Sequence, residues 1–473
     1  MPKKDEHNPT RWLVLALVMT GVFLSTMDSG MINVALPTIM RSFSLSLEYA
    51  EFVVTFYLLT ITITLVFWGK LADHLGRGNI YLTGMAIFTL GALGCYLSTS
   101  YPILLLSRFI QALGASMMMS SGPAIIKTVF PAEHLGRSLG LVGIATACGL
   151  LTGPLISGLL LSLYSWRAIF LVTMPVSIMT ILLGKFFLLD KLHQNNKGPA
   201  GKSENQFDLK GSCCWVALVI LGVFIFHRFD RFLSPSNILL ISCFIVLLYL
   251  FIRIEKRAGN PILPISLFEE RYYWTAVLTA TISFAVLFTV LALIPFYLEY
   301  IFLLPIEKVG QLMMAVPATL IVLSPFSGWL YDKIGARYLT TLGLSLSGGA
   351  LLSLAWLSAE STTLEIGVKL ALLGAGQSIF LSPNSASVLS QVREKYLGIS
   401  AGILATARNL GMVIGATLAA AIFSWWYGFF SGGETLAEYT AAESVSFMLA
   451  LRVTFIMAAA MAFLGGVVSI RRR

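Results

Sequence analysis

Charged residues are scarce in this sequence. Asp, Glu, Lys and Arg make up 12% of its 473 residues, whereas hydrophobic residues make up 57%. Soluble domains carry about 25% charged residues, so the composition excludes a water-soluble protein. It indicates an integral membrane protein that has most of its length in the lipid bilayer.

Patterns for metal, cofactor and disulfide chemistry are absent as well. The cysteines lie in or beside apolar runs without metal-ligand spacing to a histidine: Cys95, Cys148, Cys213, Cys214 and Cys243. Buried free thiols behave as small hydrophobic side chains. The chain also has no His-Glu-x-x-His motif and no nucleotide-binding glycine loop, which are motifs of enzymes. We therefore predict a protein that is not an enzyme and has neither a metal site nor a cofactor.

Long hydrophobic runs account for almost the whole chain. A helix needs about 20 apolar residues to span a bilayer. Runs of this kind lie at 12–36, 49–71, 80–98, 102–127, 136–163, 167–189, 211–227, 236–254, 272–300, 309–331, 338–357, 364–383, 397–424 and 447–469. They predict fourteen transmembrane helices, and the run at 211–227 is the weakest of them. The first run is too long for a signal-peptide core, so we expect it to be retained.

The basic residues are unevenly distributed between the two sides of the membrane. With the N-terminus in the cytoplasm, most of the 32 Lys and Arg fall on the cytoplasmic side, as the positive-inside rule requires. An even helix count returns the C-terminus to that side. The net charge of +9 then reflects topology, and no nucleic-acid partner is expected. We predict a multi-pass protein of the cytoplasmic (inner) membrane, with both termini and residues 190–210 cytoplasmic and the loop 424–446 external.

An internal repeat divides the chain. Two loops share Gly, Asp and Gly at a constant offset, each followed by Arg: Gly69, Asp73, Gly76 and Arg77, then Gly328, Asp332, Gly335 and Arg337. Repeated halves around a central site are typical of transporters. The predicted units are a six-helix bundle (1–189), a linker with an inserted helix pair (190–271) and a second six-helix bundle (272–473). Each Asp can cap a helix and pair with the Arg of its loop, which would latch one conformation; a plain helix–turn–helix is the alternative.

Asp28 and Arg108 are ionisable residues inside apolar runs. A charge at that depth costs about 2.5–3.5 kcal/mol on insertion scales unless it meets water, a partner or a proton. At 1.5 Å per residue, both residues lie in the outer half of the membrane at similar depth. We interpret them as a proton-coupling site. The alternative is two unrelated polar residues that face different neighbours. Glu299, at a helix end among aromatic residues, is interpreted as interfacial.

The fifth apolar run carries small residues at a spacing of four to five. Gly149, Gly153, Pro154 and Gly158 lie along it. Small residues let helices approach closely, and a proline permits a kink. We therefore predict that this helix acts in gating through close packing.

These motifs resemble the major facilitator superfamily and, within it, the fourteen-helix drug:proton antiporter family. Residues 69–77 resemble its loop signature, 106–114 its helix 4 signature, 140–158 its exporter helix 5 signature, and 28–37 its helix 1 signature. Thr173 and Ala112 depart from the pattern, which usually has Asn and Gly there.

The resemblance implies an all-α fold of two six-helix bundles plus two additional helices. It implies a proton-driven antiporter for multidrug efflux, and hence drug resistance, in which the helix 4 arginine takes part in proton transfer. Such a protein exports lipophilic drugs, dyes, monocations or neutral amphiphiles by alternating access. Its partners are a small-molecule substrate and protons, and we expect a monomer. The lack of central acids in the tenth to thirteenth helices argues against dicationic substrates.

Nine residues lie on helices that would line the central cavity of this fold. They are Phe23, Asn33, Tyr57, Gln111, Phe284, Phe288, Gln377, Phe380 and Arg408. Aromatic-rich pockets suit lipophilic ligands, although a single aromatic more often faces lipid. Arg408 could bind an anionic substrate group or hold backbone carbonyls at a kink. The alternative function is therefore export of an anionic or amphiphilic endogenous metabolite or lipid. Whether an envelope partner takes part is left open.

Overall fold

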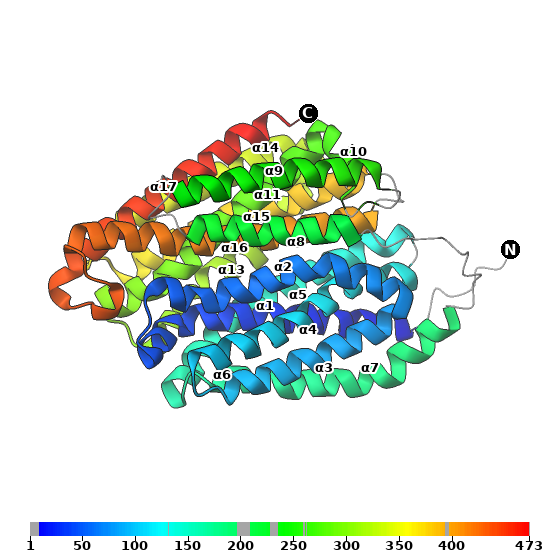
Figure 1. The fold of residues 1–473 in the computed structure, drawn as a ribbon, viewed down its shortest axis with the longest axis horizontal. Coiled ribbons are helices and arrows are strands. Elements are labelled where there is room, and N and C mark those ends of the chain that lie inside the picture. Colours follow the sequence, from blue (N-terminus) through cyan, green and yellow to red (C-terminus); the bar gives the residue numbers. More distant parts are fainter. Residues whose placement is uncertain are drawn as a thin grey trace.

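The computed structural model describes residues 9–130, 132–195, 209–227, 235–258, 261, 263–392 and 397–472. Within these ranges the protein is all-α, without a β-strand. Figure 1 shows the long helices running side by side along one direction. The predicted fold class, an all-α membrane protein, is confirmed.

The helices follow the predicted apolar runs. The first part of the chain forms α1 (Pro9–Phe43), α2 (Leu47–Leu75), α3 (Arg77–Tyr96), α4 (Tyr101–Val129), α5 (Ala132–Leu163), α6 (Ala168–Leu171) and α7 (Thr173–Asn195). Then come α8 (Leu209–His227) and α9 (Pro235–Arg257). The last part forms α10 (Ile265–Glu269), α11 (Arg271–Phe296), η2 (Tyr297–Ile301), α12 (Ile306–Met313), α13 (Ala315–Ile334), α14 (Ala336–Ala355), α15 (Thr363–Gln391), α16 (Leu397–Ser431), η4 (Leu436–Glu438), η5 (Ala441–Glu443) and α17 (Ser444–Ile470).

Two of the predicted runs are interrupted, and a proline follows each interruption. The run 167–189 breaks at Val172, and the run 309–331 breaks at Met314. Pro175 and Pro317 lie three residues later. A proline has no N–H group to bond the carbonyl four residues earlier, so the helical ladder is weakest at these places.

Twelve helical segments of the described chain are long and apolar enough to cross a membrane. Two more helical segments in it, Cys148–Leu163 and Lys210–Gly222, are apolar but shorter. The structure therefore supports a multi-pass membrane protein, while the count of fourteen spans stays a prediction.

The first and last parts of the chain repeat one packing pattern. In the first half (α1–α7), α1 packs on α5, α3 on α4, α2 on α4 and α3 on α7. In the second half (α10–α17), α11 packs on α16, α14 on α15, α13 on α15 and α14 on α17. The two sets of contacts correspond when α11, α13, α14, α15, α16 and α17 are aligned with α1, α2, α3, α4, α5 and α7, in that order. The exact unit boundaries stay predictions.

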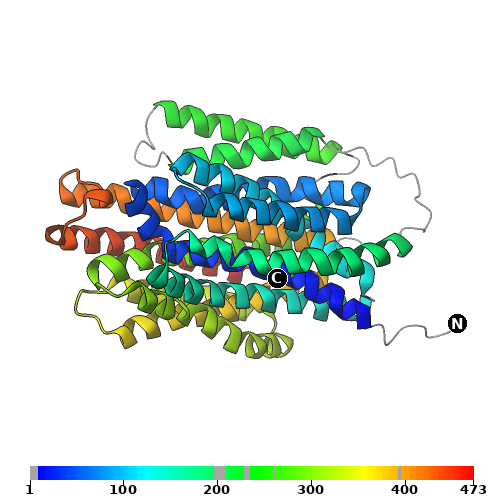
Figure 2. The same ribbon diagram turned by 90° about the horizontal axis from the view of Figure 1, so that it is seen from below.

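The inserted helices α8 and α9 lie at the edge of the bundle. Figure 2 shows this pair, in green, along one side of the molecule. α8 contacts both α2 and α16, and Trp215 on α8 donates a hydrogen bond to the Thr62 carbonyl (3.5 Å). The pair therefore covers a seam between the two halves.

Glycines with a positive φ shape both repeated loops. Gly76 has φ 91° and Gly335 has φ 75°, a region that side chains other than glycine rarely adopt. This conformational demand explains why both glycines recur. The side chains of Asp73 and Asp332 lie outside the described part, so the predicted latch is not addressed. Arg77 donates to the Ala124 carbonyl (3.0 Å).

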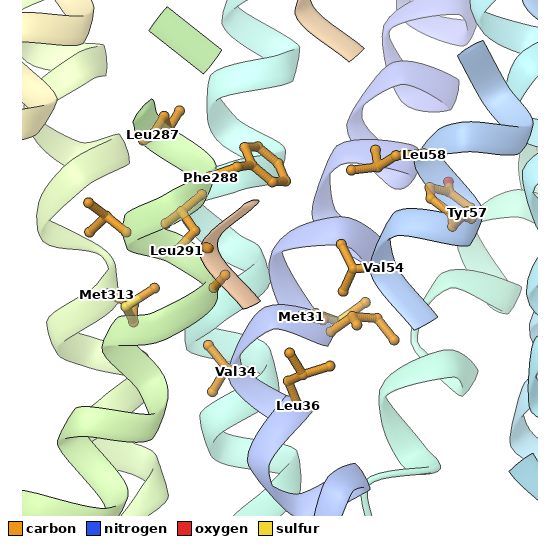
Figure 3. Packing of buried hydrophobic residues seen from close by; sticks show 14 of the residues in the cluster. Met31, Val34, Leu36, Val54, Tyr57, Leu58, Leu287, Phe288, Leu291 and Met313 are labelled. Carbon is orange, nitrogen blue, oxygen red and sulfur yellow. The ribbon is translucent and has the colours of Figure 1, made fainter. Parts of the chain in front are cut away.

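The two halves meet near the α1–α2 end of the bundle. This end holds the α1–α2 and α16–α17 connections and lies at the left of Figure 1. There α2 packs on α16, and α5 packs on α12. Figure 3 shows apolar side chains of α1 and α2, including Met31 and Leu58, on the side that faces Phe288 of α11, and Met313 of α12 belongs to the same core cluster. An apolar seal thus joins the halves at this end.

Candidate functional site

The buried centre of the first half is an ion pair between α1 and α4. Arg108 Nη1 lies 2.5 Å from Asp28 Oδ2, and both residues are fully buried. The two residues singled out in the sequence are therefore in direct contact. Their role in proton coupling stays a prediction.

Gln111 closes this pair into a triad. It lies three residues after Arg108, on the same face of α4. Its Nε2 donates to Asp28 Oδ1 (2.9 Å), and its Oε1 accepts from Arg108 Nη1 (2.8 Å). Each carboxylate oxygen of Asp28 thus has a donor. Charge-assisted bonds of this kind are the strong ones, and removing one partner of a buried pair typically costs about 3–5 kcal/mol.

An aromatic ring from α2 covers the triad. The Arg108 guanidinium carbon lies 4.0 Å from the centre of the Tyr57 ring, a cation–π geometry that gains strength when desolvated. The Tyr57 hydroxyl lies 3.0 Å from Ser25 Oγ on α1. Arg108 Nε and Nη2 are buried without a hydrogen-bond partner among the described residues. The guanidinium therefore keeps donors that could serve a rearranged carboxylate or a substrate.

A neutral pair joins α11 and α15, the helices that take the positions of α1 and α4 in the second half. Ser283 on α11 donates to Gln377 Oε1 (2.7 Å), and Gln377 Nε2 donates to the Ser283 carbonyl (3.0 Å). This contact between α11 and α15 is uncharged, whereas α1 and α4 are joined by an ion pair.

Arg408 on α16 contacts a hydroxyl and a ring. Its Nη2 donates to Ser385 Oγ (2.7 Å), and its guanidinium carbon lies 5.8 Å from the Phe284 ring. Its Nε is buried without a partner in the described part of the chain. Neither contact is to a backbone carbonyl, so the structure gives no support to the interpretation that Arg408 holds a kink.

The other predicted cavity residues lie in different surroundings. Phe288 belongs to the apolar seal (Figure 3). Phe380 belongs to a separate cluster and packs against Gly343 of α14, so it lies away from Asp28. Phe23 packs against the main core, and Asn33 is buried. The structure therefore does not bring all nine together.

The glycines of α5 face two different neighbours. A Cβ atom added to Gly153 would lie 2.7 Å from the Met27 carbonyl oxygen and 3.0 Å from Gly30 Cα, both on α1. A Cβ on Gly158 would lie 3.0 Å from the Ile306 carbonyl oxygen, on α12. Gly153 therefore packs within the first half, and the contact between the halves lies at Gly158.

The sequence reasoning missed two features at the α1–α2 end. Arg41 Nη2 lies 2.6 Å from Glu299 Oε2, so an ion pair joins α1 to η2 across the halves. Glu51 on α2 is 2% exposed and was not singled out, since an acid in the first turns of a helix usually reads as a surface residue. In the described chain no cluster of three or more His, Cys, Asp or Glu could hold a metal.

Comparisons with known proteins agree with this architecture. Residues 18–416 match the family model described as Major Facilitator Superfamily. The chain is 31% identical over 461 residues, 97% of each chain, to the riboflavin transporter RibZ of Clostridioides difficile (strain 630). It is 28% identical over 424 residues, 89% of this chain and 77% of the other, to the multidrug resistance protein Stp of Mycobacterium tuberculosis (strain CDC 1551 / Oshkosh). A bacterial homolog of the human lysosomal transporter Spinster, solved inward-facing and occupied, superposes with TM-score 0.65 at 16% identity over 98% of this chain and 97% of the other.

Proposed function

Because the chain belongs to the major facilitator superfamily of transporters, we propose that it is a proton-driven antiporter that exports lipophilic compounds by alternating access. The proposal places it in the fourteen-helix drug:proton antiporter family, in the cytoplasmic membrane, with both termini in the cytoplasm. The α1–α2 end is then the external end.

The observation that carries the proposal is the buried triad of Asp28, Arg108 and Gln111. A carboxyl group that can be charged or neutral in a low-dielectric site is suited to binding and releasing a proton. With Arg108 alongside, the carboxylate is stable. A movement that separates the two, or a substrate that engages Arg108, leaves the carboxylate without its partner and favours protonation. Opening to the cytoplasm restores the pair and releases the proton inside.

The substrate class follows from the chemistry around Arg108 and Arg408. Tyr57 lies against Arg108 and Phe284 lies beside Arg408, and aromatic side chains of this kind suit lipophilic ligands. In the second half, α11 and α15 are joined by the neutral pair of Ser283 and Gln377, which offers no negative charge to a second cationic group on the substrate. The relative Stp is named a multidrug resistance protein, in keeping with drugs, dyes, monocations or neutral amphiphiles as substrates.

A second candidate substrate is an anionic or amphiphilic metabolite. Arg408 is a cation on a helix of the predicted cavity and retains an unpartnered Nε among the described residues. The relative RibZ is named a riboflavin transporter, which makes a flavin the metabolite to try first. Transport of riboflavin, dyes, quaternary ammonium compounds and organic acids by the same proteoliposomes separates the two candidates.

The proton role is tested with Asp28→Asn. This variant mimics the neutral carboxyl group, so substrate-induced proton movement in proteoliposomes with an imposed pH gradient should be lost while substrate binding persists. Asp28→Glu should keep partial activity. Glu434→Gln is the matched control, because it neutralises an exposed acid in the α16–α17 connection and should still couple the two fluxes.

Folding is controlled with a double variant. Asp28→Asn leaves Arg108 as an unpaired buried charge, which is destabilising. Asp28→Asn combined with Arg108→Gln removes both charges and should recover thermal stability without recovering coupling. If Asp28→Asn couples protons to substrate as the parent does, the proton is carried elsewhere and the proposal is wrong.

A further inference from the structure

Glu51 is a buried acid that the proposed mechanism does not use. It lies in the second turn of α2 and is 2% exposed. Neither of its carboxylate oxygens has a hydrogen-bond partner in the part of the chain that the structure describes. Asp28, by contrast, has a donor on each oxygen. An ionised carboxylate left in this way is expensive to bury.

The surroundings of Glu51 come from both halves of the protein. Glu51 shares a small cavity of about 10 Å³ with Thr417 of α16, which is close to the space that one water molecule needs. The Thr417 hydroxyl is also buried without a partner among the described residues. The rest of the lining is Glu48, Phe52, Thr55, Ala420 and Ala421. The cavity therefore exists while α2 and α16 are packed together.

Among the described residues, the lining of this cavity offers Glu51 no opposite charge. Glu48, on the same face of α2, is the other ionisable residue of the lining. The α16 residues of the lining are Thr417 and two alanines. On α4, the Tyr101 hydroxyl bonds the Tyr49 carbonyl.

Two cations in the described parts of α1 and α4 are paired with other acids. On α1, Arg41 pairs with Glu299, and on α4, Arg108 pairs with Asp28. On α8 the titratable residue at this end is His227, whose side chain lies outside the described part. The environment of Glu51 thus suits a neutral carboxylic acid better than a carboxylate.

We infer that Glu51 binds a proton at the seam between α2 and α16 and that this proton permits the external end to close. When α2 and α16 separate, Glu51 meets external water and ionises. Closing buries the group again, so a proton must first be taken from the external solution. This proton returns to the same side in each cycle, whereas the transported proton is assigned to Asp28. The inference rests on the proposed function for its orientation and for alternating access.

The test measures opening of the external end directly. Nitroxide labels at Leu97 and Ala359, which are exposed in the α3–α4 and α14–α15 connections, report the separation of the two halves by electron-electron resonance. Labelling uses the full chain with its native cysteines replaced. The distances are measured in nanodiscs between about pH 5 and pH 8, a range that covers buried carboxyl groups. The Asp28→Asn protein is the reference, so that the remaining response reports on other sites.

Acidification should close the external end of the reference protein. For one linked proton, the ratio of closed to open molecules rises by up to about tenfold per pH unit lowered. Adding Glu51→Gln should hold the end closed at every pH. Adding Glu48→Gln, a neutralised acid in the same cavity lining, should leave the response intact. If Glu51→Gln protein is not recovered, Glu51→Met provides a second neutral side chain.

Three outcomes would overturn the inference. The reference protein could show no closure on acidification, or the response could survive Glu51→Gln. If the external end closed at constant pH when NaCl replaced choline chloride, the ion that binds at the seam would be sodium and not a proton. The labels report the conformation of the protein without substrate, whereas the Asp28 test measures coupled proton and substrate fluxes. Failure of the Glu51 inference can therefore be told apart from failure of the proposed function.

Discussion

The contact between α5 and α12 offers a graded test of how the halves close. A Cβ atom added to Gly310 would lie 2.3 Å from the Pro154 carbonyl oxygen and 3.1 Å from Gly158 Cα. Ordinary contact begins at 3.4 Å, so Gly310→Ala forces α12 and α5 about 1 Å apart. Both atoms are backbone, and a rotamer change cannot relieve the clash.

The expected magnitude follows from the cost of overpacking. An extra methyl group in a well-packed site costs about 1–3 kcal/mol. The clash arises between the halves, so this free energy is released when the external end opens. The open-to-closed ratio should therefore rise by roughly 5- to 150-fold. Gly158→Ala should act in the same direction but more weakly, because its Cβ would lie 3.0 Å from the Ile306 carbonyl oxygen.

The assay uses the labels at Leu97 and Ala359 together with export rates. Gly310→Ala should populate the long distance and slow export, because the return to the inward-facing state becomes unfavourable. Gly349→Ala on α14 is the matched control, since a Cβ there meets nothing within 4 Å. Parent-like distances and export in Gly310→Ala would refute the idea that this glycine contact closes the external end.

Two further predictions concern topology and packing within the first half. An impermeant thiol reagent should modify a cysteine at Gly432 from outside, and one at Gly198, which lies outside the described residues, only after permeabilisation; the reverse pattern contradicts the proposed orientation. Gly153→Leu should abolish export while leaving protein in the membrane, because the larger side chain pushes α5 away from α1 near Met27. Export and the melting temperature of the purified protein check this prediction. Undiminished export would show that close α1–α5 packing is not needed.

The ion pair of Asp28 and Arg108 could be predicted because two simple rules applied to it. Ionisable residues in spanning runs are rare and need partners, and the helical rise places each at a depth in the membrane. That the two helices are neighbours came from the resemblance to the major facilitator fold, and residues at one depth on neighbouring helices can meet. The all-α fold followed from hydropathy in the same way, since a bilayer admits few backbone structures.

The neighbours across the halves could not be predicted by these rules. A run of small residues shows that something approaches closely, but not what. Gly149 and Gly153 lie only about 40° apart around α5, whereas Gly153 and Gly158 lie about 140° apart. This angle explains why the first two face α1 and the third faces α12. Likewise, depth alone could not place Thr417 beside Glu51, because it does not say which helices of the two halves adjoin.

Helix α2 is positioned to connect the two sites assigned to protons. The Asp28 pair lies within the first half, so its protonation alters no contact between the halves directly. Tyr57, however, rests on Arg108 at 4.0 Å, and its neighbour Leu58 points into the apolar seal (Figure 3). Glu51 lies seven residues before Leu58, on the same face of α2. We expect a shift of Tyr57 after loss of the ion pair to move α2, the helix that carries both Leu58 and Glu51. Changes at Asp28 would then reach the external seam through α2.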